Sequence, residues 1–143
     1  MRFLSRFLQQ GPRLRVRPSV PTLHALAKDA PALLVFNHGR GAAHDVVVMI
    51  RVRHSAFQFD PIETLEPDAE APLLHSSTTG RFKLEQMTVS AHWFRIALRA
   101  IVQDVKEVLQ IPLTIRYQDD KGTARTTYAT LNCDEHLRLR VTQ

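Results

Sequence analysis

Apolar and polar residues alternate with a period of two through most of the chain. In residues 13–17, Leu14 and Val16 share one face and three arginines share the other. Residues 44–53 repeat the alternation, with a face of valine and isoleucine. Because successive side chains of a strand point to opposite sides of a sheet, this period predicts strands with one buried face.

Shorter patterns predict further strands. We expect them at residues 31–37, 57–59, 62–65, 113–117, 123–132 and 137–141, with another beginning at 73–77. An acidic, proline-bounded turn is expected at 66–72, and a hairpin turn at 118–122, where Gly122 would take a positive φ. About seven strands with turns at short intervals are typical of an antiparallel β-sandwich, so the sequence predicts a mainly β fold.

Residues 90–110 break the period of two. Their apolar residues recur at three and four, with Ser90 as a candidate N-cap and Pro112 as a stop. This predicts one inserted amphipathic helix packed on the sandwich. The alternative is an exposed helix or dimer contact. Its contact residues would be Trp93, Phe94 and Ile101.

Three turn motifs point to a family. They are Asn37-x-Gly39-x-Gly41, the stretch Leu65-x-Pro67-Asp68-x-Glu70, and Tyr117-x-Asp119-x-x-Gly122. Together they resemble a bacterial immunoglobulin-like β-sandwich of the kind found in CARDB-like domains, except that Asp68 stands where glycine is usual. The resemblance implies a single Ig-like domain over residues 13–143 and says little about activity. Residues 1–12 would form a flexible or amphipathic N-terminal segment.

The glycine-rich stretch at residues 35–46 also contains two histidines. A phosphate-binding loop leads into a helix, whereas a strand is expected after Gly41, so we predict no nucleotide site and no cofactor. His38, His44 and Asp45 could approach a metal ion, but they lack a further ligand at a recognised spacing. We therefore predict a solvated turn and no metal site.

No catalytic grouping is found, and we predict that the chain is not an enzyme. The acidic residues lie mainly in turns, and no nucleophile or zinc-protease motif is present. Cys133 precedes Asp134 and Glu135, which would raise the pKa of the thiol and make it unreactive.

The net charge of +5 and the pI of about 10.0 make contact with anionic partners favourable. If the first and last strands lie side by side, their arginines form one basic stripe. Its members are Arg13, Arg15, Arg17, Arg138 and Arg140. Charges of this kind also protect strand edges from pairing with other chains.

The leading function is therefore protein–protein interaction or self-association. The alternative is a basic module for nucleic acid or anionic membrane. Stacking aromatics for single strands are scarce, because we expect Phe36, Phe57 and Phe59 in the core.

No apolar stretch reaches the roughly 20 residues that a membrane span needs. Residues 1–8 lack an uninterrupted apolar segment and a cleavage site, so no signal peptide is expected. The single cysteine suits a reducing compartment. The expected location is the cytoplasm, with the soluble domain of a membrane-anchored protein as the alternative.

Overall fold

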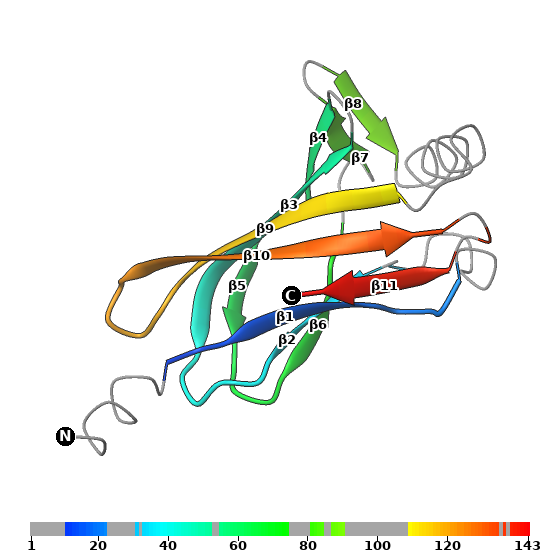
Figure 1. Cartoon of the computed structure of the whole chain (residues 1–143). Coiled ribbons are helices and arrows are strands. Elements are labelled where there is room, and N and C mark those ends of the chain that lie inside the picture. The colour runs from blue at the N-terminus through cyan, green and yellow to red at the C-terminus, as the bar shows by residue number, and fades with distance from the viewer. Residues whose placement is uncertain are drawn as a thin grey trace.

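The computed structural model of the 143-residue chain describes residues 11–22, 31, 33–52, 55–74, 81–84, 87–90, 109–134, 136 and 138–143. The described part is mainly β and is built from antiparallel strands (Figure 1). They are β1 (Leu14–Pro18), β2 (Leu33–Asn37), β3 (Ala43–Val52), β4 (Ser55–Gln58), β5 (Ile62–Leu65), β6 (Glu70–Pro72), β7 (Arg81–Leu84), β8 (Met87–Ser90), β9 (Leu109–Gln118), β10 (Ala124–Cys133) and β11 (Leu139–Thr142).

The strands form two main sheets. The smaller sheet has the order β1-β2-β6. The larger sheet has the order β11-β10-β9-β3-β4. Strand β5 also pairs with β3, at the residues of β3 that precede those paired with β4. A separate hairpin joins β7 and β8. The two main sheets therefore divide the chain between them in an interleaved way, because β3 to β5 lie between β2 and β6 in sequence.

The edges of the two sheets meet where β1 and β11 lie side by side (Figure 1). The backbone N–H of Leu139 donates to the carbonyl of Pro21 over 2.8 Å, and Thr22 forms an isolated bridge with Arg138. The side-chain amide of Gln143 accepts from the N–H of Val16 and donates to the carbonyl of Leu14. The first and last strands are thus neighbours in different sheets.

One hydrophobic core contains side chains from both main sheets. Its fully buried members include Leu14 and Val35 of the smaller sheet and Val48, Leu113 and Ile115 of the larger one. These positions alternate along their strands, as the period of two predicts. Burial of each such side chain contributes about 1.5–3 kcal/mol, so this alternation accounts for the arrangement of the two sheets.

The predicted strands at 13–17, 31–37, 44–53, 113–117, 123–132 and 137–141 are confirmed, with shifts at their ends. The prediction for residues 66–74 is wrong in part. A short strand, β6, lies where a turn was expected, and no strand begins at Leu73. Val35 of β2 pairs with Ala71, and this edge pairing lasts only three residues and ends at a proline.

A helix was predicted at residues 90–110. Its residues 91–108, with Trp93, Phe94 and Ile101, lie outside the described residues. The predicted C-terminal end is wrong, because Leu109 and Gln110 already belong to β9. Ser90 is the last residue of β8, and the segment that it would cap lies outside the described residues. Pro112 lies within β9, opposite Thr130, and stops no helix. Ile111 and Leu113, on either side of Pro112, are both buried in β9. Their spacing of two belongs to a strand, although the sequence pattern was interpreted as the three-and-four spacing of a helix.

Three turn positions have the left-handed backbone that favours glycine. Gly122 has φ 77°, as predicted for the hairpin turn. Asp68 has φ 64°, a backbone conformation that glycine adopts more readily. Asp45 has φ 50° at an irregularity between β3 and β9 that no sequence pattern had indicated.

Candidate functional site: two outer sheet faces

The glycine-rich stretch after β2 is a turn held by Asn37. This side chain is fully buried, and its amide donates to the carbonyls of Gly41 and Leu65 over 2.8 and 2.9 Å. Its Oδ1 accepts from the backbone N–H of Arg13 and of Gly39. One asparagine therefore joins the entry to β1, the turn and the end of β5.

Gly39 is required by close packing in this turn. A Cβ at this position would lie 2.4 Å from the carbonyl oxygen of Gly11 and 2.5 Å from the backbone nitrogen of Arg13. Both contacts are with backbone atoms, which cannot move away cheaply. The stretch that suggested a phosphate or metal site therefore connects the two sheets and leaves no room at Gly39 for a ligand.

The two histidines of this stretch have different partners. Nε2 of His44 lies 2.7 Å from Oδ1 of Asp120, and its Nδ1 lies 3.4 Å from the hydroxyl of Thr64. The ring of His38 instead stacks on Phe36. Within the described ranges, no group of three His, Cys, Asp or Glu side chains could hold a metal ion.

Cys133 is a buried thiol at the end of β10. Burial, and to a smaller extent the neighbouring Asp134, raises its pKa to about 11. The sequence predicted the direction of this shift from the acidic neighbours, but desolvation is the larger cause. Very little thiolate exists near neutral pH, so Cys133 is not a nucleophile in this state.

The first three arginines of the predicted stripe lie on the outer face of the smaller sheet. Arg13, Arg15 and Arg17 are exposed along β1, on the side opposite the buried Leu14 and Val16. Arg17 is paired with Glu70 of β6. Its Nε donates to Oε2 over 2.6 Å, and its Nη2 donates to Oε1 over 2.7 Å. These bonds raise the pKa of Arg17 and lower that of Glu70.

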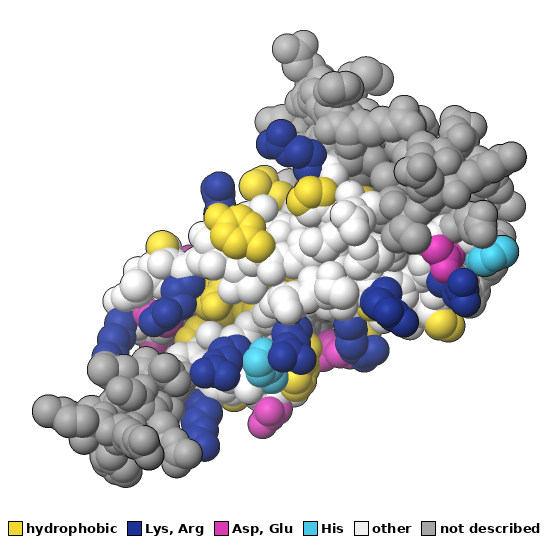
Figure 2. Space-filling model, viewed as in Figure 1, with side chains coloured by type: hydrophobic (Ala, Val, Ile, Leu, Met, Phe, Trp, Pro, Cys, Tyr) yellow, Lys and Arg dark blue, Asp and Glu magenta, His cyan; other side chains and the backbone are white. Residues whose placement is uncertain are grey.

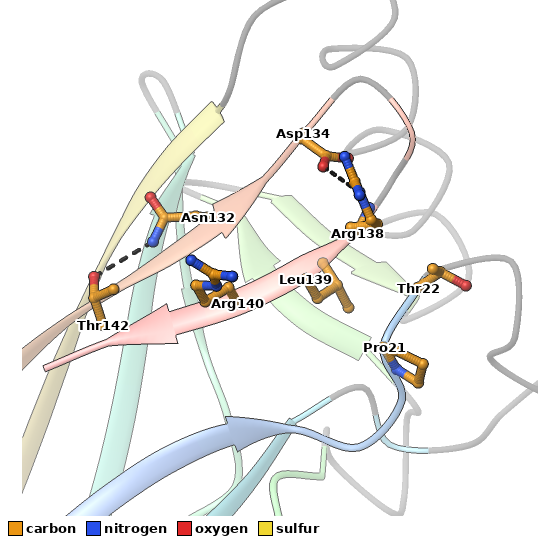
Figure 3. Close-up of a pocket in the computed structure, with 8 residues that line it drawn as sticks. All are labelled: Pro21, Thr22, Asn132, Asp134, Arg138, Leu139, Arg140 and Thr142. Carbon is orange, nitrogen blue, oxygen red and sulfur yellow. Dashed lines mark hydrogen bonds and ion pairs between the residues drawn. The ribbon is translucent and has the colours of Figure 1, made fainter.

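The remaining two arginines of the stripe lie on β11, in the larger sheet. Nε of Arg138 pairs with Oδ2 of Asp134 over 2.6 Å. Arg140 is exposed and lies beside Asn132 of β10. An open groove of about 650 Å³ runs between these residues and the segment after β1 (Figure 3). The groove offers one guanidinium that is free of an acidic partner, that of Arg140.

The predicted stripe is therefore divided between two sheets. Its two parts adjoin because β1 and β11 are neighbours, and Figure 2 shows Lys and Arg side chains in a row along this edge. Within the part of the chain that the structure describes, Arg13, Arg15 and Arg140 have no ion pair. The pairing of Arg17 could not be read from the sequence, because Glu70 is 53 residues away, whereas Asp134 lies only four residues from Arg138.

The expectation that Phe36 lies in the core is wrong. Its neighbours Val35 and Asn37 on β2 are buried, so Phe36 points to the outer face and is only half-buried. Its ring centroid lies 6.4 Å from that of His38, with 17° between the planes. Phe59 is buried as predicted, and the side chain of Phe57 lies outside the described residues.

The outer face of the larger sheet has a tyrosine that the sequence analysis missed. Tyr128 is 71% exposed on β10, opposite Thr114 of β9, which in turn lies opposite Met49 of β3. The signal was present, because Ala129 and Leu131 mark the buried positions of β10 and place Tyr128 on the other side. Figure 2 shows hydrophobic side chains gathered on this face with basic ones beside them.

Exposed arginines also lie on this second face. They are Arg51 of β3, Arg116 of β9 and Arg140 of β11. Tyr128 on β10 and Met49 on β3 share this face, with Thr114 of β9 between them. On the smaller sheet the arginines instead follow the edge strand, β1.

Among the residues that the structure describes, no helix has both the length and the apolar character that a membrane crossing requires.

Comparison of the chain with protein-family descriptions, with curated proteins and with solved structures finds no match.

Proposed function

We propose that the chain is a noncatalytic interaction module built on an immunoglobulin-like β-sandwich. The strand order supports this fold, because the sheets β1-β2-β6 and β10-β9-β3-β4 resemble the two sheets of an Ig-like sandwich, with β11 as a further strand. The core shared by the two sheets supports it too. We further propose the cytoplasm as the location, with a membrane-anchored protein's soluble domain as the alternative.

The partner in this proposal is another protein or a second copy of the chain, bound on the outer face of the larger sheet. The observation that favours this face is the 71% exposed side chain of Tyr128, which shares the face with the half-buried Met49 and Val47. Tyrosine, methionine and arginine are enriched in protein interfaces, and a large aromatic at the centre of a face commonly dominates the binding energy. Arg51 and Arg116 supply the polar rim.

The test is capture of partners from native lysate at low and high salt, with Tyr128→Ser beside the intact chain. Lys121→Ala in the exposed hairpin turn is the matched control. We expect a discrete protein that is retained at high salt by the intact chain and by the control but lost with Tyr128→Ser. Sedimentation at increasing concentration would show the same loss for self-association. Retention that ignores the tyrosine, or turnover of a substrate, would contradict the proposal.

A second candidate function is a basic module that binds nucleic acid or anionic membrane through the arginines of β1 and β11. It is favoured by Arg13, Arg15 and Arg140, which have no ion pair within the described residues. Binding of this kind falls steeply with salt. The double variant Arg15→Glu with Arg138→Glu should abolish it, and binding insensitive to both salt and this variant would exclude it.

A further inference from the structure

The outer face of the smaller sheet brings aromatic rings and free cations together. Arg15 of β1 lies directly opposite Phe36 of β2, and the backbone N–H of His38 donates to the carbonyl of Arg13 over 2.9 Å. Phe36 and His38 are two residues apart on the same side of the chain, with nearly parallel rings. The guanidinium groups of Arg13 and Arg15 therefore lie along a row next to a row of two rings.

The charge of this row is not compensated locally. Glu70 is the acidic residue at the described strand positions of this face, and it is fully engaged by Arg17. The pKa of His38 is lowered by partial burial and then by the charges of Arg15 and Arg13. The charges of both arginines thus act on the imidazole. The lowered pKa keeps the ring neutral and suited to stacking near neutral pH.

We propose that this face binds single-stranded nucleic acid, with phosphates on Arg13 and Arg15 and bases stacked on Phe36 and His38. The inference rests on the second candidate function, the basic module. Aromatic rings flanked by cations are the recurring means of binding single strands, because every base has a face that can stack. Arginines alternate along β1 at about 6.8 Å, twice the rise of a strand, so successive phosphates can meet successive guanidiniums.

The other anionic partners use less of this face. In a duplex the bases are already stacked on one another, so its contacts here would be with phosphates alone. A lipid headgroup or an acidic peptide would likewise pair with the arginines but would have no planar group to place on the rings. Preference for single strands is therefore the property that separates these partners.

The experiment measures the affinity of the intact chain for a labelled single strand of about 12 nucleotides, within the usual site size. The matched duplex, heparin and phosphatidylserine vesicles serve as competitors. We expect the single strand to bind tightest. Phe36→Leu should weaken it about tenfold, and Arg15→Gln should weaken both the single strand and heparin. Because Phe36 is half-buried, thermal melting checks the fold, and the exposed His38→Leu provides a second variant without a ring.

Controls on the other face make the assignment specific. Tyr128→Leu and Arg116→Gln alter a ring and a guanidinium of the larger sheet and should leave single-strand affinity unchanged. Loss of binding with these two, together with full binding by Phe36→Leu and Arg15→Gln, would overturn the inference. Equal affinity for single strand, duplex and vesicle would also overturn it.

The same titrations separate this inference from the function on which it rests. Salt-sensitive binding of heparin that depends on Arg15 but not on the rings would keep the basic module and exclude the single-strand site. Absence of binding to every polyanion would exclude both.

Discussion

The two outer faces of the molecule are built from the same kind of strand, yet they present their basic residues differently. On the smaller sheet Arg13 and Arg15 lie along the edge strand β1, beside the half-buried Phe36 of the central strand β2. On the larger sheet the exposed Tyr128 lies on β10, and the exposed arginines are spread over β3, β9 and β11. The difference shows that the alternation of a strand decides which side chains are exposed, while the neighbouring strands decide what those side chains can do together.

This comparison assigns salt-sensitive binding to one face and salt-resistant binding to the other. Burial of an aromatic side chain depends little on ionic strength, whereas contacts between guanidinium and phosphate groups release counterions. The predictions below alter both faces together or one face at a time.

The largest effect is expected from Asn37→Ala, which should disturb both faces together. The side-chain amide of Asn37 is buried and bonds to the entry of β1, to the turn after β2 and to the end of β5. Its loss leaves the N–H of Arg13 and the carbonyls of Gly41 and Leu65 without these partners. We expect the free energy of unfolding to fall by about 3 kcal/mol or more. Urea denaturation measures this change. Asn132→Ala, whose amide has one exposed bond to Thr142, is the control and should cost less than about 1 kcal/mol. Equal losses in the two variants would show that Asn37 is not the joint between the sheets.

The salt dependence of single-strand binding should respond to one face only. Replacing Arg13 and Arg15 together by glutamine should reduce the slope of log affinity against log salt by about 1.4, or 0.7 for each lost phosphate contact. The pair Arg51→Gln and Arg116→Gln should leave the slope as it is. Titrations at several salt concentrations decide this, and an equal reduction by both pairs would remove the distinction between the faces.

Acidic pH should strengthen single-strand binding through His38. Partial burial, and then the charges of Arg15 and Arg13, hold the pKa of His38 below the ordinary value of 6.5, so the free protein resists protonation there. A bound phosphate would raise that pKa, so affinity should increase as pH falls through the window just below 6.5. Stability should change in the opposite sense, because a lowered histidine pKa favours the folded state above 6.5 and this benefit is lost at lower pH. His38→Gln should flatten both profiles, and an unchanged binding profile in that variant would refute the prediction.

The smallest effect is expected from Glu70→Gln. This change frees Arg17 from its ion pair and adds a third available guanidinium to the row on β1. A contact of this exposed kind should tighten single-strand binding roughly twofold. Glu63→Gln, in the exposed part of β5, is the control for charge alone. Weaker binding after Glu70→Gln would mean that the Arg17–Glu70 pair is needed to order the face.

Much of the sheet structure could be predicted from the sequence, because burial of alternate residues dominates strand formation. The arginines of β1 and the buried positions of β3 follow from the period of two. The positive φ of Gly122 in the hairpin turn is a further case. These features depend on residues close together in sequence.

The content of each face could not be predicted, because it depends on pairs distant in sequence. Phe36 was expected in the core since it is large and apolar, but Val35 and Asn37 occupy the buried side of β2. The neutralisation of Arg17 depends on Glu70, which comes from the strand that the sequence described as a turn. Strand order, which brings β1 beside β11, is likewise a property of the whole fold.

The most direct test of the two-face account is an NMR titration of the uniformly labelled chain with the single strand. The account predicts that shift changes gather on residues 13–17 and 34–38 while Met49 and Tyr128 stay unperturbed. Shift changes centred on Met49, Thr114 and Tyr128 would contradict it, since nucleic acid would then occupy the face assigned to a protein partner. Absence of any change at saturating strand would contradict the assignment of a nucleic-acid surface to the smaller sheet.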